Sequence, residues 1–257
     1  NSAFNSNPFS PVFPSILEIK DQESPLNGEL FTPSEIKNFI GTRPYAVTID
    51  NAEFARAQMS GLISADLVYE FPTERFTNRF LGIFWSRKPN IIGPVRSIRT
   101  YMMDILPDTD AILSHFGQSA PDPNKTYREK ESIAVDSALY FSNYSVDHTE
   151  CSVSQDKSLI DLGIPTEHTY FTNISSLGDC IPAGWVRNPT ISNYLFKSDI
   201  ESSLRPVISE MSISIGTNSP FSSRWIYDPS KNIYNRYQKG AIHKERELGG
   251  ISAKNLI

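Results

Sequence analysis

Long apolar runs are absent from this 257-residue chain: no stretch approaches the eighteen or so consecutive apolar residues that a membrane-spanning helix requires. The N-terminus also lacks the successive basic, apolar and small-residue regions of a signal peptide. Positive charge is scarce, because 24 Lys and Arg face 29 Asp and Glu and the pI is about 5.4. The resulting net charge of -5 repels phosphate backbones, so we expect no sequence-independent nucleic-acid binding.

Cysteine is nearly absent as well, since the chain contains only Cys151 and Cys180. These two could form one disulfide in an oxidising compartment or remain free thiols in a reducing one. A metal site that combines both cysteines with His148 and His168 is a further alternative. It has little support, because no C-x-x-C pair is present. We therefore expect no metal.

The common enzyme motifs are also missing. The sequence contains no Gly-x-Ser-x-Gly elbow, no Walker loop, no dinucleotide-binding fingerprint and no His-Glu-x-x-His. The standard hydrolase, nucleotide-binding and zinc-protease classes therefore lose most of their support, and we expect no cofactor. What remains is ample core material, with 39% hydrophobic, 11% aromatic and only 21% charged residues. This composition predicts a folded, soluble protein of one large domain or two ordinary ones.

Hydrophobic patterning predicts a succession of strands with a few short helices. Thr32-Pro33-Ser34-Glu35 is typical of a helix start, with Thr32 as N-cap and Glu35 as the returning carboxylate of a capping box. Apolar, β-rich runs predict strands at 43–50, 66–71, 77–85 and 111–115, of which the second and third form a hairpin. Residues 118–161 are predicted to hold long loops, and 224–229 with 233–237 a second hairpin.

The segment Gly93-Pro94-Val95-Arg96-Ser97-Ile98-Arg99 carries the clearest chemical signal. Apolar residues recur there at three- and four-residue spacing, which predicts a helix that begins at Pro94 and ends at Pro107. Arg96 and Arg99 would then share one face of its first turn, where the helix dipole disfavours cations. They could form ion pairs with Asp50, Glu70 and Glu74, or accept a carboxylate, phosphate or sulfate group, and the two alternatives are not exclusive.

The other candidate residues lie on strands and loops. If Glu74 and Arg75 form a two-residue turn, Glu70 lies opposite Arg79 on one face of the first hairpin. His115 ends a buried strand beside a glycine, which is a common position for acid–base chemistry but also for a structural histidine. His168 and His243 are interpreted as exposed or turn histidines.

These residues together carry a resemblance to a known family. Residues 43–51, 60–70, 79–84 and 93–99, and 110–112 leading to His115, resemble the YerB-like family of bacterial lipoproteins in order and spacing. Ser24-Pro25-Leu26-Asn27-Gly28 looks like the opening motif of this family. Trp225-Ile226-Tyr227-Asp228-Pro229 and the closing Ser252-Ala253-Lys254-Asn255 extend the resemblance over most of the chain.

The resemblance implies a mixed α/β (α+β) fold in an extracytoplasmic protein that a lipid anchor, absent from this chain, attaches to the membrane. The expected organisation is an extended Asn-, Ser- and Pro-rich arm (1–23), an N-terminal α/β domain (24–189) and a smaller β-rich C-terminal domain (190–257). The first domain should contain a mixed sheet with a central hairpin and flanking helices. Because relatives continue past the closing motif, the C-terminal domain is expected to be truncated. The family implies no established reaction.

Two hypotheses follow from these observations. The first is a binding or scaffolding protein of the cell envelope that takes a small anion, an envelope component or a protein partner; its expected ligand-binding residues are Arg96, Ser97, Arg99, Arg79 and Asn51. The second is a hydrolase or transferase that acts on an anionic or glycan substrate; its candidate catalytic residues are His115, Asp50 and Glu70. An open cleft that gathers these side chains would favour the enzyme, and a closed network the binding protein.

Overall fold

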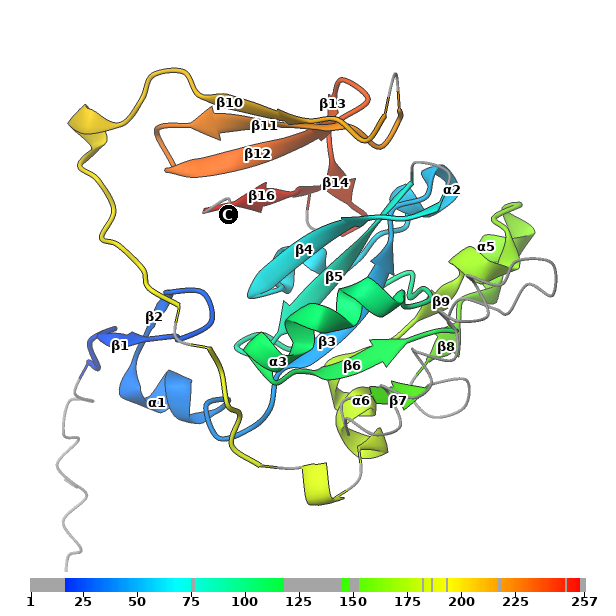
Figure 1. Cartoon of the computed structure of the whole chain (residues 1–257), viewed down its shortest axis with the longest axis horizontal. Helices are drawn as coiled ribbons and strands as arrows, with labels where there is room; N and C mark the ends of the chain where they lie inside the picture. Colours follow the sequence, from blue (N-terminus) through cyan, green and yellow to red (C-terminus); the bar gives the residue numbers. More distant parts are fainter. Residues whose placement is uncertain are drawn as a thin grey trace, which may run out of the picture.

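Two five-stranded β-sheets form the framework of the protein (Figure 1). The computed structural model describes residues 17–74, 77–117, 145–147, 153–181, 183–185, 187–192, 194–216, 219–247 and 249–254. The first sheet consists, in spatial order, of β4 (Leu67–Pro72), β5 (Asn78–Phe84), β3 (Tyr45–Asp50), β6 (Ile112–His115) and β7 (Ser145–Asp147). All of the strands predicted for this region between residues 43 and 115 are therefore present.

The first sheet is mixed, because β3 runs antiparallel to β5 but parallel to β6, and β6 runs parallel to β7. This arrangement confirms the expected mixed α/β class. The hairpin of β4 and β5 forms one edge of the sheet, however, and the central strand is β3. Both β3 and β5 are buried along nearly their whole length, which explains why large apolar residues occupy both of their faces.

The helices are few and short, as the sequence pattern indicates. Helix α1 (Pro33–Lys37) has the predicted capping box, in which the Thr32 hydroxyl accepts from the Glu35 N–H and the Glu35 carboxylate accepts from the Thr32 N–H. The other helical segments are α2 (Glu53–Arg56), η1 (Leu62–Ser64), η3 (Thr100–Ile105), α3 (Leu106–Thr109), α5 (Lys157–Asp161), η4 (Thr166–His168), α6 (Ile174–Cys180), η5 (Ala183–Trp185) and η6 (Ser202–Leu204).

The prediction of a helix that begins at Pro94 is wrong for the first turn. Residues 93–99 are extended, the Gly93–Pro94 peptide bond is cis, and the helical segment begins only at Thr100. The Arg96 N–H donates to the Thr48 carbonyl, so this stretch pairs with the end of β3 instead of coiling. Pro107 lies in the first turn of α3 rather than after the helix.

Packing on both sides of the sheet explains why these residues are extended. Val95 belongs to the apolar cluster on one side, together with Ile49 and Phe84, whereas Ile98 belongs to the cluster on the other side with Met102. A helix would place residues three apart on the same face, but an extended chain beside the end of β3 can send them to opposite faces. Tertiary packing therefore overrides the apparent helical period.

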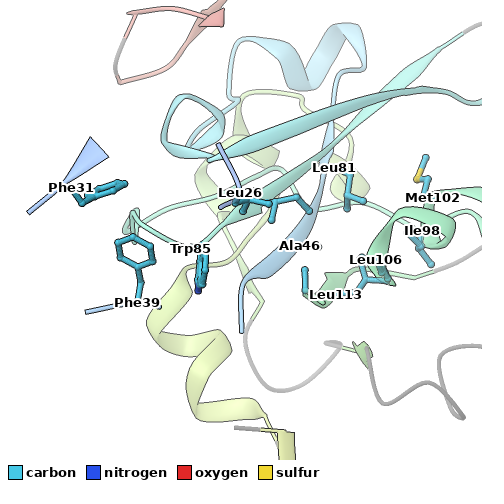
Figure 2. Packing of buried hydrophobic residues seen from close by; sticks show 12 residues of the cluster. Leu26, Phe31, Phe39, Ala46, Leu81, Trp85, Ile98, Met102, Leu106 and Leu113 are labelled. Carbon is cyan, nitrogen blue, oxygen red and sulfur yellow. The ribbon is translucent and has the colours of Figure 1, made fainter. Parts of the chain in front are cut away.

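The larger apolar cluster joins the N-terminal segment to the face of the sheet that η3 and α3 cover. Figure 2 shows Met102, Ile98 and Leu106 near one end of this cluster and Phe39 and Trp85 near the other. The rings of Phe39 and Trp85 pack edge to face, with centroids 5.1 Å apart. Burial of this cluster fixes α1 and η3 against the sheet, and with them the segment that carries Arg96 and Arg99.

The second sheet contains the predicted second hairpin, formed by β11 (Ser223–Asp228) and β12 (Ile233–Gln238). Asn232 adopts a left-handed conformation (φ 55°) in the connecting turn, which asparagine tolerates well. The remaining strands of this sheet are β10 (Glu210–Ile213), β13 (Ala241–Ile242) and β16 (Ser252–Ala253). In Figure 1 this sheet lies on the side of β4 and β5, with β14 (Lys244–Glu245) between it and the first sheet.

Three two-stranded sheets complete the described structure. They pair β1 (Gln22–Glu23) with β2 (Leu30–Phe31), β8 (Ser154–Gln155) with β9 (Tyr170–Phe171), and β14 with β15 (Gly249–Gly250). Most of the predicted N-terminal arm and of the loop region 118–161 lies outside the described residues. The described part of that loop region contains only short elements, β7, β8 and α5.

Candidate functional site

The register of the first hairpin decides which charged residues meet. The expected pairing of Glu70 with Arg79 is wrong, because Glu70 lies opposite Phe80, and Arg79 lies opposite Phe71. The last pair is Pro72 with Asn78, so residues 73–77 connect the strands in place of a two-residue turn. This shift of one residue sends the two side chains to opposite faces of the sheet. The charged residues therefore form two separate clusters.

The first cluster lies at the end of β3 and is called the arginine cluster below. It consists of Asp50, Glu74, Arg79, Arg96, Arg99 and His168. Asp50, the last residue of β3, is its centre and is only 3% exposed. Its Oδ2 atom lies 3.3 Å from Arg96 Nε and 2.5 Å from His168 Nδ1, and its Oδ1 accepts from the Ala52 N–H at 2.8 Å.

These contacts keep Asp50 ionised despite its burial. Burial alone would raise the pKa of Asp50, but the hydrogen bond with His168, the charge of Arg96 and the Ala52 N–H together hold that pKa below its usual value. Asp50 thus serves two partners at once, a guanidinium and an imidazole. The sequence signal for His168 was weak, because an isolated histidine in a short loop motif gives no indication of a buried partner 118 residues away.

Arg99 has a carboxylate partner of its own. Its Nε and Nη2 atoms donate to the two carboxylate oxygens of Glu74, at 2.5 and 2.9 Å, in the paired geometry that guanidinium and carboxylate groups favour. Burial opposes ionisation of Glu74, yet the hydrogen bonds and charge of Arg99 lower the pKa of that carboxyl to about 2. Arg99 and Glu74 therefore form the structural ion pair that was one of the two alternatives.

Arg79 differs from the other two arginines. Its Nη1 atom donates to the Ser97 carbonyl at 2.6 Å, but within the described residues its guanidinium forms no salt bridge. Burial, followed by the charges of Arg99 and Arg96, lowers the pKa of Arg79 to about 10, although the charges of Asp50 and Glu74 partly oppose this shift. A positive charge that is only 8% exposed and lies beside two other arginines is therefore the least compensated group of the cluster.

The remaining predicted site residues are engaged elsewhere. The Ser97 hydroxyl donates to the Phe116 carbonyl at 3.0 Å, and only the Ser97 carbonyl contacts the cluster. His115 is 1% exposed, and its Nδ1 lies 2.8 Å from the Gly117 carbonyl oxygen. Asn51 donates to Asn78 at 2.6 Å. The structure thus brings Asp50, Arg79, Arg96 and Arg99 together at the end of β3.

The second cluster, called the interface cluster, lies on the other face of the sheet. It joins Glu70, Asn78 and Asn51 of the first sheet region to Arg236, Gln238 and His243 of the second. Arg236 is fully buried; it donates to Glu70 and Gln238 at 2.6 Å each, and its guanidinium lies 5.1 Å from the centre of the Phe80 ring.

The charges of the interface cluster serve to join the two sheets. Burial raises the pKa of Glu70, against the opposing effect of Arg236, and burial together with the charges of Arg236 and Arg56 lowers the pKa of His243 to about 3. His243 is therefore neutral at physiological pH and, at 3% exposure, is not the exposed histidine that the sequence suggested. Because Glu70 accepts from the buried Arg236, its role is structural.

One of the two cysteines takes part in a disulfide. Cys180 is disulfide-bonded, and the other cysteine of the chain, Cys151, lies outside the described residues. Among the described residues, no group of three or more His, Cys, Asp and Glu side chains could hold a metal ion. The same part of the chain contains no helix that is both long and apolar enough to cross a membrane.

Comparison with known proteins places this architecture in a class whose activity is undefined. Residues 31–156 match the family model described as the N-terminal domain of a protein of unknown function, DUF3048. The protein from Bacillus subtilis (strain 168) named "Putative lipoprotein YerB" is 30% identical over 245 residues, which span 93% of this chain and 67% of the relative. The chain therefore belongs to the YerB-like family.

The fold agrees with that assignment. The crystal structure of the YerB protein from Bacillus subtilis superimposes with a TM-score of 0.67 at 24% sequence identity, and the match covers 88% of this chain and 70% of that one. The mixed α/β fold with several sheets and few helices is thus shared with a solved structure.

Proposed function

We propose that this YerB-like chain is an extracytoplasmic binding or scaffolding protein whose arginine cluster accepts a small anion. The name of the Bacillus subtilis relative, a lipoprotein, supports a location outside the cytoplasmic membrane, to which an N-terminal lipid would attach the full-length protein. A disulfide at Cys180 is in keeping with such a compartment, because disulfides persist in oxidising environments.

The guanidinium of Arg79, the least compensated charge of the cluster, is the observation that carries the proposal. The cluster contains three arginines and two carboxylates, and Arg96 and Arg99 each have a carboxylate partner whereas Arg79 has only a carbonyl. Buried charges in proteins are paired or bind ligands, because an isolated buried ion is costly. An anion at Arg79 would remove this imbalance and would also contact the neighbouring guanidiniums.

The expected affinity is modest. A hydrogen bond to a charged group contributes roughly 1.5–3 kcal/mol, so two such bonds contribute about 3–6 kcal/mol; a dissociation constant of about 1 mM corresponds to roughly 4 kcal/mol. At an anion concentration 100 times the dissociation constant, ligand binding stabilises the native state by about 2.7 kcal/mol. This stabilisation is measurable as a rise in melting temperature.

The test compares thermal unfolding in sulfate with unfolding in sodium chloride at matched ionic strength. The native protein should melt at a higher temperature in sulfate, and Arg79→Met should abolish the difference. Arg224→Met is the matched control, because Arg224 is an exposed arginine whose partner, Glu210, lies in the second sheet. A native protein without a sulfate-specific rise, or an equal loss of the rise in both variants, would refute the proposed site.

The enzyme alternative is favoured by one specific contact, although not by the residue expected from the sequence. The hydrogen bond between Asp50 and His168 orients an imidazole beside Arg96, as acid–base catalysis requires. Such a pair would support a hydrolase or transferase that acts on an anionic or glycan substrate. Loss of hydrolysis of a phosphate or sulfate ester in His168→Asn, with retention in Arg224→Met, would support this activity; equal rates in both variants would refute it.

A further inference from the structure

Asp50 contacts two groups that can carry positive charge, the guanidinium of Arg96 and the imidazole of His168. The same oxygen, Oδ2, contacts both Arg96 Nε and His168 Nδ1. The carboxylate is only 3% exposed, so water cannot replace either partner at low cost. Any change in the charge around Arg96 therefore alters the electrostatic environment of His168 through Asp50.

The charge balance of the cluster changes sign when a divalent anion binds. With His168 neutral, three guanidiniums and two carboxylates leave one net positive charge, and a dianion such as sulfate converts this to one net negative charge. The anion also competes with Asp50 for the Arg96 guanidinium. A proton on His168 would restore neutrality and would keep a cation beside Asp50, so the bound state favours protonation of His168.

The surroundings of His168 can accommodate that proton. Asp50 faces Nδ1 at 2.5 Å, and a carboxylate oxygen of Glu167 lies 3.9 Å from Nε2. Arg96, which donates to the Glu167 carbonyl at 2.8 Å, is the charged neighbour that opposes protonation. The Phe54 ring, with its centroid 6.0 Å from that of the imidazole, carries no charge. Both ring nitrogens thus face an acceptor, and anion binding would weaken the opposing effect of Arg96.

We propose that anion binding at the arginine cluster is coupled to uptake of one proton by His168, with Asp50 as the group that transmits the coupling. This inference rests on the proposed anion site and adds its regulation by pH: a dianion binds more tightly as the pH falls. His168 is here a positioning and charge-balancing residue, and no reaction of the anion is implied.

The experiment uses sulfate as the probe, because its charge does not change between pH 5.5 and 8.5. Calorimetric titration at constant ionic strength should show affinity that falls with rising pH, by up to about tenfold per pH unit where His168 is neutral in the free protein. At a fixed pH in that range, titrations in two buffers of different ionisation enthalpy should show a buffer-dependent heat that corresponds to uptake of up to one proton. The buffer comparison needs no variant, so it does not depend on the folding of a mutant protein.

A variant of His168 identifies the group that takes up the proton. In His168→Asn the amide can still donate to Asp50 but cannot take up a proton, so binding should become weaker and independent of pH and buffer. Proton uptake that persists in His168→Asn would assign the proton to another group and overturn the proposal. Sulfate binding to the native protein with no dependence on pH or buffer would overturn the coupling but leave the anion site intact. No binding at any pH would refute the anion site itself and the coupling with it.

Discussion

Glu245 allows a quantitative prediction, because its carboxylate is buried where the second sheet region contacts the first. It lies on β14 and is 5% exposed; its Oε1 accepts from the Ile63 N–H at 2.8 Å, at the start of η1. Its Oε2 atom is buried and has no hydrogen-bond partner within the described structure. The adjoining Arg246 N–H donates to the Met59 carbonyl, so this contact is part of the interface.

The carboxyl of Glu245 makes that interface sensitive to pH. Burial raises its pKa from 4.5 to about 7, and the charge of Glu247 adds to this effect, whereas the N–H groups of Ile63, Leu62 and Gly61 oppose it. The native state therefore binds the proton more tightly than the unfolded state does. The resulting stability is fully present below pH 4.5 and is lost as the pH rises towards 7; the two pKa values set its upper limit at about 3 kcal/mol.

The perturbation is Glu245→Gln, which keeps an oxygen acceptor for the Ile63 N–H but removes the charge. Urea unfolding between pH 4 and 8 should give nearly equal free energies for variant and native protein at pH 4. Relative to the native protein, the free energy of unfolding of the variant should then increase as the pH rises, by up to about 3 kcal/mol near pH 8. Glu210→Gln, which removes an exposed carboxylate from β10, is the control and should show no such gain. A difference between Glu245→Gln and native protein that stays constant with pH would refute the reasoning.

Two further predictions concern stability, and a third concerns the disulfide. Arg236→Met should destabilise the protein by about 3–5 kcal/mol in urea unfolding, because it leaves a buried carboxylate without its cation; a loss below 1 kcal/mol would contradict this. Gly61→Ala should cost more than Gly240→Ala: both positions have positive φ, for which alanine pays roughly 1–2 kcal/mol, but only at Gly61 would the new Cβ lie 2.6 Å from the Ile91 carbonyl oxygen. Equal losses in the two variants would refute the steric argument. Thiol titration of the unreduced, denatured protein should detect no free thiol, because Cys180 is disulfide-bonded and the chain has one other cysteine; two reactive thiols would contradict the disulfide.

Local signals predicted the elements whose cause is local. The capping box of α1 depends on Thr32 and Glu35, which are three residues apart, and the β11–β12 hairpin depends on a short polar turn between two alternating runs. Strands β3 and β5 were predictable because burial on both faces requires continuous apolar sequence. In each of these cases the residues that determine the structure are close together in the chain.

The errors occurred where a distant contact decides the outcome. The apolar spacing from Val95 to Ile105 fits a helix, yet Val95 and Ile98 pack on opposite sides of the sheet, which no local pattern reveals. His168 and His243 looked like loop residues because their partners, Asp50 and Arg236, come from other elements. Their burial depends on the tertiary arrangement of strands.

The connection between β4 and β5 sets the strand register, and this register determines which charged residues enter each of the two clusters. With a two-residue turn, Glu70 would lie opposite Arg79 and would neutralise its charge. Because residues 73–77 form the connection instead, Glu70 lies on the other face, where it binds Arg236 and joins the two sheets. The same shift leaves Arg79 beside Arg96 and Arg99 with only a carbonyl acceptor. The contact that joins the sheets and the weakly compensated charge of the proposed anion site therefore have one cause, the register that the β4–β5 connection sets.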